Sequence, residues 1–230
     1  MKTIIIKILK FLMYSVLVFF VSSLLIVVIY KFISPPFTPV MVIRIFEGWF
    51  EGKNISISKK WVPYEDISPN IFRAVVSAED AKFMKHDGFD WQAIDNAKKY
   101  NERKHGTKMR GASTISMQTA KNTFLWHGRV YIRKALEAYF TVLTEFIWGK
   151  KRILEVYVNV IELGEGIYGV ESASNHFFGK HAGELTKREA ALLASVLPNP
   201  RRWSPASPTS YIESRVVFIE GRMGGVAIPK

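Results

Sequence analysis

The sequence of 230 residues contains no cysteine. Without cysteine the chain carries no disulfide framework and no thiolate metal site. Its five histidines show no metal-binding spacing such as His-x-x-x-His, which is a common arrangement of ligands on one helix face. The sequence therefore predicts no metal site built by the protein.

Strand-like alternation of apolar and polar residues is also scarce, and no internal repeat is visible. Helical spacing of apolar residues recurs instead, so we predict a fold that is almost all helix. Residues 164–169 do show the spacing Gly-x-Gly-x-x-Gly. A dinucleotide-binding fingerprint, however, needs a preceding strand and a surrounding βαβ unit. We interpret these glycines as a tight turn between helices.

Acidic residues are outnumbered, with 20 Asp and Glu against 32 Lys and Arg, for a formal net charge of +12. Such an excess favours an anionic partner, which can be lipid headgroups, a phosphorylated ligand or nucleic acid. Nucleic acid is the least expected of the three, because the chain also carries a membrane segment. We predict no nucleic-acid partner.

That membrane segment is the uncharged run of residues 11–30, which is long enough to cross a bilayer as a helix. Three lysines precede it and Lys31 follows it, which favours an N-terminus in the cytoplasm and the rest of the chain outside. A cleaved signal peptide is the alternative. The apolar run exceeds a usual signal core and residues 34–37 make a poor cleavage site, so we predict a retained anchor.

We divide the chain into an N-terminal tip and anchor (1–33), a proline-rich joint with a membrane-proximal segment (34–60) and a main domain (61–230). The prolines of the joint require extended backbone. Residues 41–50 are markedly apolar, and two interpretations stay open: the segment lies on the membrane surface, or it packs as an ordinary helix on the domain. Residues 99–111 are polar and basic, which is typical of a mobile loop.

Glu79 is the first candidate catalytic residue. Ser68 followed by Pro69 is a helix-start signal, and the helix that it predicts delivers Glu79 near its far end. There Glu79 interrupts an apolar stripe that runs from Phe72 to Phe83 at helical spacing. Desolvation disfavours the ionised form of a carboxyl group and so helps it to exchange protons near neutral pH. The alternative is an acid that merely turns toward solvent at a helix end.

The second candidate site is the stretch 110–122, where a glycine precedes small hydroxyl residues at a loop-to-helix junction. Such a junction leaves backbone N–H groups accessible to anionic oxygens. If the helix starts near Ser113, then Thr114, Gln118 and Lys121 share one face that offers hydroxyl, amide and ammonium groups. The alternative is an ordinary helix cap with a solvated polar face.

A long helical pattern begins at residue 130, and a second helix is predicted after Gly149. Arg133 and Glu137 are four residues apart and can pair, although a surface pair of this kind contributes little. They belong to a polar row beside an apolar stripe. The row is Arg133, Glu137, Thr141 and Thr144, and the stripe is Leu136, Tyr139, Phe140, Leu143 and Ile147. Farther on, Thr186 and Glu189 form a capping box that opens a helix ended by Pro198.

Five segments with characteristic residues follow one another between about residues 61 and 205. They are Glu79, Asp80, Phe83, His86 and Gly88; Gly111, Ser113, Thr114, Ile115, Gln118, Lys121 and Asn122; residues 133–137; Lys151, Ile153, Leu154, Glu155, Tyr157 and Asn159; and residues 189–194 with Leu197 and Pro198. In this order and spacing they resemble the motifs of glycosyltransferase family 51, the peptidoglycan glycosyltransferases, and specifically its monofunctional biosynthetic transglycosylases. Ala112, where many members carry a second glycine, is a mild departure.

The resemblance implies a mostly α, lysozyme-like helical domain with a small jaw lobe near the membrane, preceded by one transmembrane helix. It implies an enzyme of the bacterial inner membrane, with its domain on the outer side, that polymerises lipid II into β-1,4 glycan strands and releases undecaprenyl pyrophosphate. Because the chain ends at Lys230, we expect no transpeptidase domain. Implied partners are lipid II, the growing lipid-linked glycan, the membrane and other cell-wall synthesis proteins.

The resemblance also implies roles for residues. Glu79 would act as the base that deprotonates the acceptor hydroxyl, on the face opposite the leaving group, with inversion. Glu137 would hold a cationic network and contact the donor. A pyrophosphate leaving group needs positive charge, which Lys121, Arg133, Arg110 and Lys134 could supply; whether a divalent cation joins it stays open. The other implied substrate-binding residues are Asp80, Phe83, His86, Ser113, Thr114, Gln118 and Asn122.

Two other functions compete with this one. A helical domain built around one glutamate also suits a lysozyme or lytic transglycosylase that cleaves glycan. The phosphate-suited second motif argues against that function. A non-catalytic, membrane-anchored scaffold of the cell-wall machinery is the other, and there Glu79 would be merely structural.

Overall fold

The computed structural model describes residues 2–52, 56–104, 110–128 and 130–230. The chain forms two compact units, Met1–Pro35 and Pro36–Lys230. The first unit consists mainly of helix α1 (Lys2–Phe32). Residues Thr3–Phe32 of this helix are long and apolar enough to cross a membrane, and the same length and composition also fit a signal sequence.

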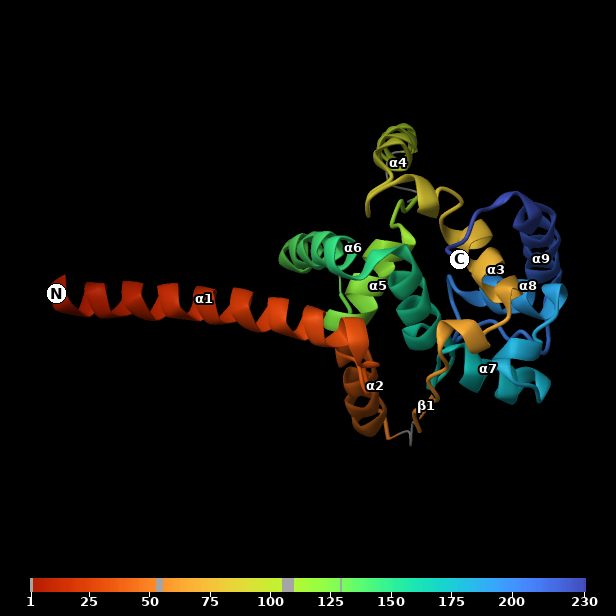
Figure 1. The fold of residues 1–230 in the computed structure, drawn as a ribbon, viewed down its shortest axis with the longest axis horizontal. Coiled ribbons are helices and arrows are strands. Elements are labelled where there is room, and N and C mark those ends of the chain that lie inside the picture. The colour runs from red at the N-terminus through yellow and green to blue at the C-terminus, as the bar shows by residue number, and fades with distance from the viewer. Residues whose placement is uncertain (1, 53–55, 105–109, 129) are drawn as a thin grey trace. The chain divides into compact units, whose positions relative to one another are not determined.

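The second unit is mostly helical, which confirms the predicted fold class (Figure 1). Its α-helices are α2 (Pro39–Phe50), α3 (Pro69–Glu79), α4 (Trp91–Arg103), α5 (Ile115–Phe124), α6 (Tyr131–Val160), α7 (Val170–Phe178), α8 (Lys187–Val196) and α9 (Ser210–Arg222). Single turns of 3₁₀ helix lie at Tyr64–Asp66, Phe83–Lys85, Ala182–Glu184 and Met223–Gly225. The strands are β1 (Ser58–Lys59), β2 (Glu162–Gly164) and β3 (Ile167–Tyr168).

The three short strands form one sheet in the order β1-β3-β2, with β1 parallel and β2 antiparallel to β3. The glycine-rich segment 164–169 therefore makes a β-hairpin, and the interpretation as a turn between helices is wrong in detail. Gly169 enters α7 with φ 81°, and a Cβ there would lie 2.7 Å from the carbonyl oxygen of Asn159. Only glycine fits this close approach, so the position fixes where α7 leaves the sheet.

Helices α3, α8 and α9 pack together and form much of the core (Figure 1). Ser68 caps α3 as predicted: its hydroxyl accepts from the backbone N–H of Asn70 and donates to the carbonyl of Leu185 at 2.9 Å. The capping box of Thr186 and Glu189 at the start of α8 is also confirmed. Because Ser68 is bonded to the segment before α8, the cap also fixes the position of α3, which carries Glu79 as its last residue.

Helix α6 breaks at Gly149, whose φ of 73° and ψ of 171° are not helical, and this confirms the second helix predicted there. Helix α5 packs along α6. The buried face of the first half of α6 contains the polar row Arg133, Glu137, Thr141 and Thr144 together with Phe140. The surface-pair interpretation of Arg133 and Glu137 is therefore wrong. The threonines tolerate burial because each hydroxyl donates to a carbonyl one turn earlier, Thr141 to Glu137 and Thr144 to Phe140.

Residues 41–50 belong to helix α2, which packs on the domain, and contact of this helix with the membrane surface stays a prediction. Thr38 caps it, and its inner face, including Met41 and Arg44, is buried against the domain. Its other face leaves Phe46, Trp49 and Phe50 between 53% and 82% exposed. The segment is thus a packed helix that still presents an apolar surface.

The predicted loop 99–111 is wrong over its first part, because α4 continues to Arg103. Its polar composition belongs to an amphipathic surface helix, in which only Ala97 is buried. The middle of the predicted loop, 105–109, lies outside the described residues.

Candidate active site

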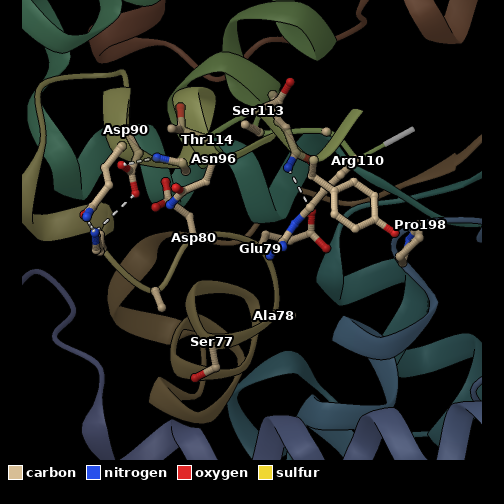
Figure 2. Close-up of a pocket in the computed structure, with 18 of the residues that line it drawn as sticks. Ser77, Ala78, Glu79, Asp80, Asp90, Asn96, Arg110, Ser113, Thr114 and Pro198 are labelled. Carbon is tan, nitrogen blue, oxygen red and sulfur yellow. Dashed lines mark hydrogen bonds and ion pairs between the residues drawn. The ribbon is translucent and has the colours of Figure 1, made fainter. Parts of the chain in front are cut away.

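A cavity of about 1040 Å³ opens where the end of α3, one face of α4 and the segment before α5 meet (Figure 2). The ends of α8 and α9 close it through Pro198 and Arg222. Its polar side chains are those of Ser77, Glu79, Asp80, Lys82, Asp90, Gln92, Asn96, Lys99, Tyr100, Arg103, Arg110, Ser113, Thr114, Gln118 and Arg222. Glu79 and Gln118, which come from separate candidate segments, therefore line one space.

Glu79 is held by a short chain of hydrogen bonds. The amide nitrogen of Gln118 donates to Oε2 of Glu79 at 2.9 Å, and the hydroxyl of Tyr157 donates to the amide oxygen of Gln118 at 3.3 Å. Within the described residues, Oε1 of Glu79 accepts no hydrogen bond from the protein. One carboxylate oxygen is thus fixed, while the other can meet a ligand in the cavity.

Asp80 has a different task from its neighbour Glu79. Its carboxylate accepts from the backbone N–H of Ile115 at 3.0 Å and contacts Nε2 of His86 at 3.0 Å. The side chain is only 3% exposed. Asp80 therefore ties the end of α3 to the start of α5, and it positions Glu79 opposite Gln118.

Thr114 is the N-cap of α5, whose first residue, Ile115, lies two residues after the predicted start near Ser113. Its hydroxyl donates to the carbonyl of Gly88 at 2.6 Å and accepts from the N–H of Met117. This bonding holds the hydroxyl at the helix start, where Thr114 lines the same cavity as Gln118, whereas Lys121 does not line it. Gln118 and Lys121, one turn apart inside α5, do share a face.

A second cluster surrounds Glu137, whose side chain is 3% exposed. Arg133 donates to Oε2 at 2.7 Å, and the ammonium of Lys134 donates to Oε1. Arg133 also donates to the carbonyl of Gly128 at 2.7 Å. The ammonium of Lys134 lies 3.5 Å from the hydroxyl of Ser113. Because Ser113 lines the cavity, this cluster adjoins the cavity wall.

The pKa of Lys121 is influenced both by Glu79 and by the cluster around Glu137. Burial lowers the pKa of Lys121 below its usual value, and the nearby charges of Arg133 and Lys134 lower it further, whereas Glu137 and Glu79 raise it. Within the described residues the ammonium of Lys121 is engaged in no ion pair. A partly desolvated, unpaired cation between two carboxylates is suited to receive an anion.

The structure separates the predicted site residues into three groups. The first lines the cavity and comprises Glu79, Asp80, Arg110, Ser113, Thr114 and Gln118. The second is the cluster of Lys121, Arg133, Lys134 and Glu137. The third is Phe83, His86 and Asn122, which do not line the cavity. Phe83 is fully buried beneath the ammonium of Lys150 at 4.5 Å, so it has no surface to offer a ligand.

Sequence reasoning missed the wall of the cavity that α4 contributes. Gln92, Asn96, Lys99 and Arg103 follow one another at spacings of three and four, a helical row whose last two members fall in the segment that was interpreted as a loop. It also missed the contact of Tyr157 with Gln118, because Tyr157 was named among the motif residues without a role, and it missed Arg222, for which no local pattern gives a signal. No group of three or more His, Asp or Glu that could hold a metal ion occurs among the described residues.

The chain is similar to known proteins over most of its length. The family model described as transglycosylase matches residues 51–224. A biosynthetic peptidoglycan transglycosylase of Bdellovibrio bacteriovorus is 50% identical over 221 residues, which cover 96% of this chain and 87% of that protein. Similar proteins with the same description occur in Rhodospirillum centenum, 50% identical over 84% of this chain and 81% of that protein, and in Caulobacter vibrioides, 50% identical over 87% and 84%.

Proposed function

The chain belongs to the transglycosylase family, and we propose that it is a peptidoglycan glycosyltransferase that polymerises lipid II into β-1,4 glycan strands, with release of undecaprenyl pyrophosphate and inversion at the anomeric carbon. The observation that carries this proposal is the pairing of two unlike sites. Glu79 faces a cavity with one free carboxylate oxygen, and a cluster of cations around Glu137 adjoins the same wall through Ser113 and Lys134.

Glu79 is the base in the proposed reaction. As the acceptor hydroxyl attacks the anomeric carbon of the donor, Oε1 of Glu79 takes the hydroxyl proton and the new glycosidic C–O bond forms. The bond between that carbon and the phosphate oxygen breaks on the opposite face, and its electron pair leaves with the pyrophosphate. Attack and departure on opposite faces invert the configuration.

The cations stabilise the leaving group. A pyrophosphate is a stable anion and needs positive charge more than a proton donor. Lys121, Arg133 and Lys134 supply that charge. Both oxygens of Glu137 are occupied by Arg133 and Lys134, so Glu137 orients the cations instead of acting as a second base.

The same cluster argues against the two competing functions. Cleavage of a glycan by a lysozyme-like route requires an acid that protonates a glycosidic oxygen and has no anionic leaving group to bind. A scaffold needs no partly buried lysine, which costs free energy where no ligand repays the desolvation. A partly buried cationic cluster beside a base fits transfer from a phosphorylated donor.

We further propose that α1 is a retained anchor in the inner membrane, with the N-terminus in the cytoplasm and the catalytic unit outside. Its length and apolar composition support a span, and the lysines before it support the orientation. The exposed apolar face of α2, including Phe46, Trp49 and Phe50, would hold the catalytic unit at the bilayer surface. Intact mass of the membrane-extracted protein separates an anchor from a signal peptide, since cleavage would remove the first 33 residues or so.

The decisive experiment supplies the purified full chain, in detergent, with lipid II or with preformed uncrosslinked glycan. We expect glycan strands to appear from lipid II, together with undecaprenyl pyrophosphate, and the preformed glycan to stay intact. Shortening of the preformed glycan would favour the lytic function. Turnover of neither substrate would contradict catalysis and favour the scaffold.

A further inference from the structure

The cavity beside Glu79 is lined by positively charged side chains that have no part in the proposed role of Glu79 as base. We propose that Arg103, Arg110 and Arg222 form an anion-binding subsite that holds a carboxylate or phosphate group of the glycan acceptor. This inference rests on the proposed function, because it assigns the cavity to the substrate whose hydroxyl Glu79 deprotonates.

The three arginines come from three separate parts of the fold and line one cavity. Arg103 is the last residue of α4, Arg110 belongs to the segment before α5, and Arg222 is the last residue of α9. The side chain of Asn101 holds the backbone of Arg110, accepting from its N–H at 2.7 Å and donating to its carbonyl at 3.1 Å. Arg110 is thereby fixed to the same helix that carries Arg103.

Apart from Glu79, the other charged groups of the cavity are already engaged. Asp80 is bonded to His86 and to the backbone of Ile115. Asp90 caps α4 by accepting from the N–H of Ala93 at 2.9 Å, and Lys82 lies 3.9 Å from it. Outside the cavity wall, Asp95 pairs with Lys99 at 2.6 Å. These contacts satisfy the acids and the lysines without using any of the three arginines.

In the described parts of the chain, none of the three guanidinium groups is paired with a carboxylate. Arg103 donates only its Nε, to the carbonyl of Lys99 at 3.3 Å, which leaves its terminal nitrogens available. Arg222 lies over the ring of Phe218 at 4.9 Å, a contact that orients a guanidinium without neutralising it. Unpaired guanidinium groups in a concave site attract anions and bind carboxylate or phosphate oxygens in pairs.

The anion belongs to the acceptor because the donor has cations of its own. Lys121, Arg133, Lys134 and Glu137 do not line this cavity, and they account for a pyrophosphate leaving group. Glu79 does line the cavity, and its free oxygen must meet the attacking hydroxyl of the acceptor. An anionic group within the reach of Arg103, Arg110 and Arg222 is therefore carried by the molecule that presents that hydroxyl.

Two groups of a lipid-linked acceptor have this chemistry: the pyrophosphate that joins it to the lipid and the carboxylates of its attached peptide. Both are oxyanions that a guanidinium binds in the same way. The experiment distinguishes them with acceptors that lack one or the other.

The assay needs substrates with separate roles. A fluorescent lipid II without the attacking hydroxyl serves only as donor, and an acceptor with a carbon in place of the anomeric oxygen serves only as acceptor. Single transfer by the full-length protein is then measured for Arg103→Ala, Arg222→Ala, Arg222→Lys and the double variant Arg103→Ala/Arg222→Ala. Arg73→Ala is the matched control, since Arg73 is exposed on α3 and lines no part of the cavity.

We expect the double variant to raise the acceptor KM roughly tenfold to a hundredfold, the usual effect of losing charged hydrogen bonds. The donor KM and thermal unfolding should change little, because the side chains are exposed. Arg222→Lys should recover only part of the affinity, since an ammonium lacks the forked geometry. The effect should vanish with whichever acceptor lacks the bound anion, the peptide-free one or the pyrophosphate-free one.

An unchanged acceptor KM in the double variant would overturn the inference, and so would an equal rise in the donor KM or an effect that persists with both stripped acceptors. Absence of any transfer by the wild-type chain would contradict the proposed function instead. In that case, binding of a fluorescent acceptor alone, compared between wild type and the double variant, would still decide whether the arginines hold its anion.

Discussion

The side-chain amide of Gln118 donates a hydrogen bond of 2.9 Å to Oε2 of Glu79. A side-chain amide can turn either its nitrogen, a donor, or its oxygen, an acceptor, toward Glu79. The hydrogen bond with Tyr157 determines which of the two faces Glu79. Burial, with help from the charges of Glu79 and Asp80, raises the pKa of Tyr157 well above 10, so its phenol keeps its proton and donates to the amide oxygen. The amide nitrogen must then face Glu79, and the carboxylate is held in one orientation.

Tyr157→Phe tests this chain of hydrogen bonds. The substitution removes only the hydroxyl, so the side-chain amide of Gln118 can rotate and turn its oxygen toward Glu79. The amide oxygen and the carboxylate are both hydrogen-bond acceptors and repel each other. We expect kcat to fall about tenfold, the effect of one lost neutral hydrogen bond, with little change in KM. The variant Gln118→Glu should be worse in the same direction. If Tyr157→Phe left kcat unchanged while lowering only the melting temperature, the hydroxyl would have a purely structural role.

Glu79→Gln tests the base itself. Glutamine keeps the shape of the side chain and can still hydrogen-bond to Gln118, but it cannot accept the hydroxyl proton. Turnover of lipid II should therefore fall by the usual contribution of a general base, roughly 10²–10⁴-fold, with normal thermal unfolding. Glu102→Gln, on the exposed face of α4, is the control. A correctly folded Glu79→Gln protein that polymerises at the wild-type rate would refute the assignment.

Features that depend on neighbours in the chain were predictable from the sequence. The N-cap at Ser68, the capping box at Thr186 and the break at Gly149 each depend on a few consecutive residues. Glu79 was identifiable for the same reason, because a single acid in an apolar stripe is a local pattern. The second motif was correctly placed at a loop-to-helix junction, but its helix starts at Ile115, two residues after Ser113, so Thr114 is its N-cap.

Features that depend on tertiary contacts were not predictable. Tyr157 meets Gln118 from 39 positions away, and nothing in either segment indicates the other. The buried face of α6 was misjudged for a related reason. The pairing of Arg133 and Glu137 follows from their spacing of four residues, but their burial, with the carbonyl of Gly128 as a further partner of Arg133, follows only from the packing of α5 on α6. Arg222, at the end of α9, reaches the cavity through the fold alone.

Glu137→Gln should separate donor binding from proton transfer. The change leaves Arg133 and Lys134 without their shared anion. The cations Lys121, Arg133 and Lys134 then repel one another and lose their orientation. We expect the donor KM to rise about tenfold or more, and the free energy of unfolding to fall by about 1–3 kcal/mol for the weakened buried contact. Glu171→Gln is a matched control, because Glu171 is equally buried at 3% exposure but pairs with Lys60 and His181 instead of Arg133 and Lys134. Equal donor KM values for the two variants would contradict the assigned role.

Glu171 should also control stability in acid. Burial alone would raise its pKa, but hydrogen bonds from the N–H of Ala182 and from His181 and Lys60 outweigh burial and lower the pKa to about 2. A carboxylate with a lowered pKa stabilises the fold above its unfolded value near 4.5, and this contribution is lost as pH falls toward 2. Melting temperatures of wild type and Glu171→Gln at pH 7 and pH 3 should therefore differ more at pH 7. A constant difference at both pH values would show that Glu171 is not the titrating group.

The charge of Lys121 should destabilise the fold, whereas that of Glu171 stabilises it, because burial lowers the pKa of Lys121 from its usual 10.5. Between the lowered pKa and 10.5, the folded chain binds fewer protons than the unfolded chain, so the free energy of unfolding rises with pH across this window. Below the window, the charged Lys121 costs stability. Lys121→Met removes the charge and keeps most of the volume, and so we expect an equal or higher melting temperature at pH 7.

Lys121→Met should weaken donor binding although it does not lower the melting temperature. Without the ammonium the donor pyrophosphate loses a cation, so the donor KM of Lys121→Met should rise by roughly tenfold or more. In the wild type, the donor KM should itself rise as pH increases through the lowered pKa of Lys121, whereas in Lys121→Arg this rise should be absent because the guanidinium stays charged. Lys187→Met, an exposed lysine in the first turn of α8, controls for general charge. If Lys121→Met lost stability and kept the wild-type donor KM, Lys121 would serve the fold and not the donor.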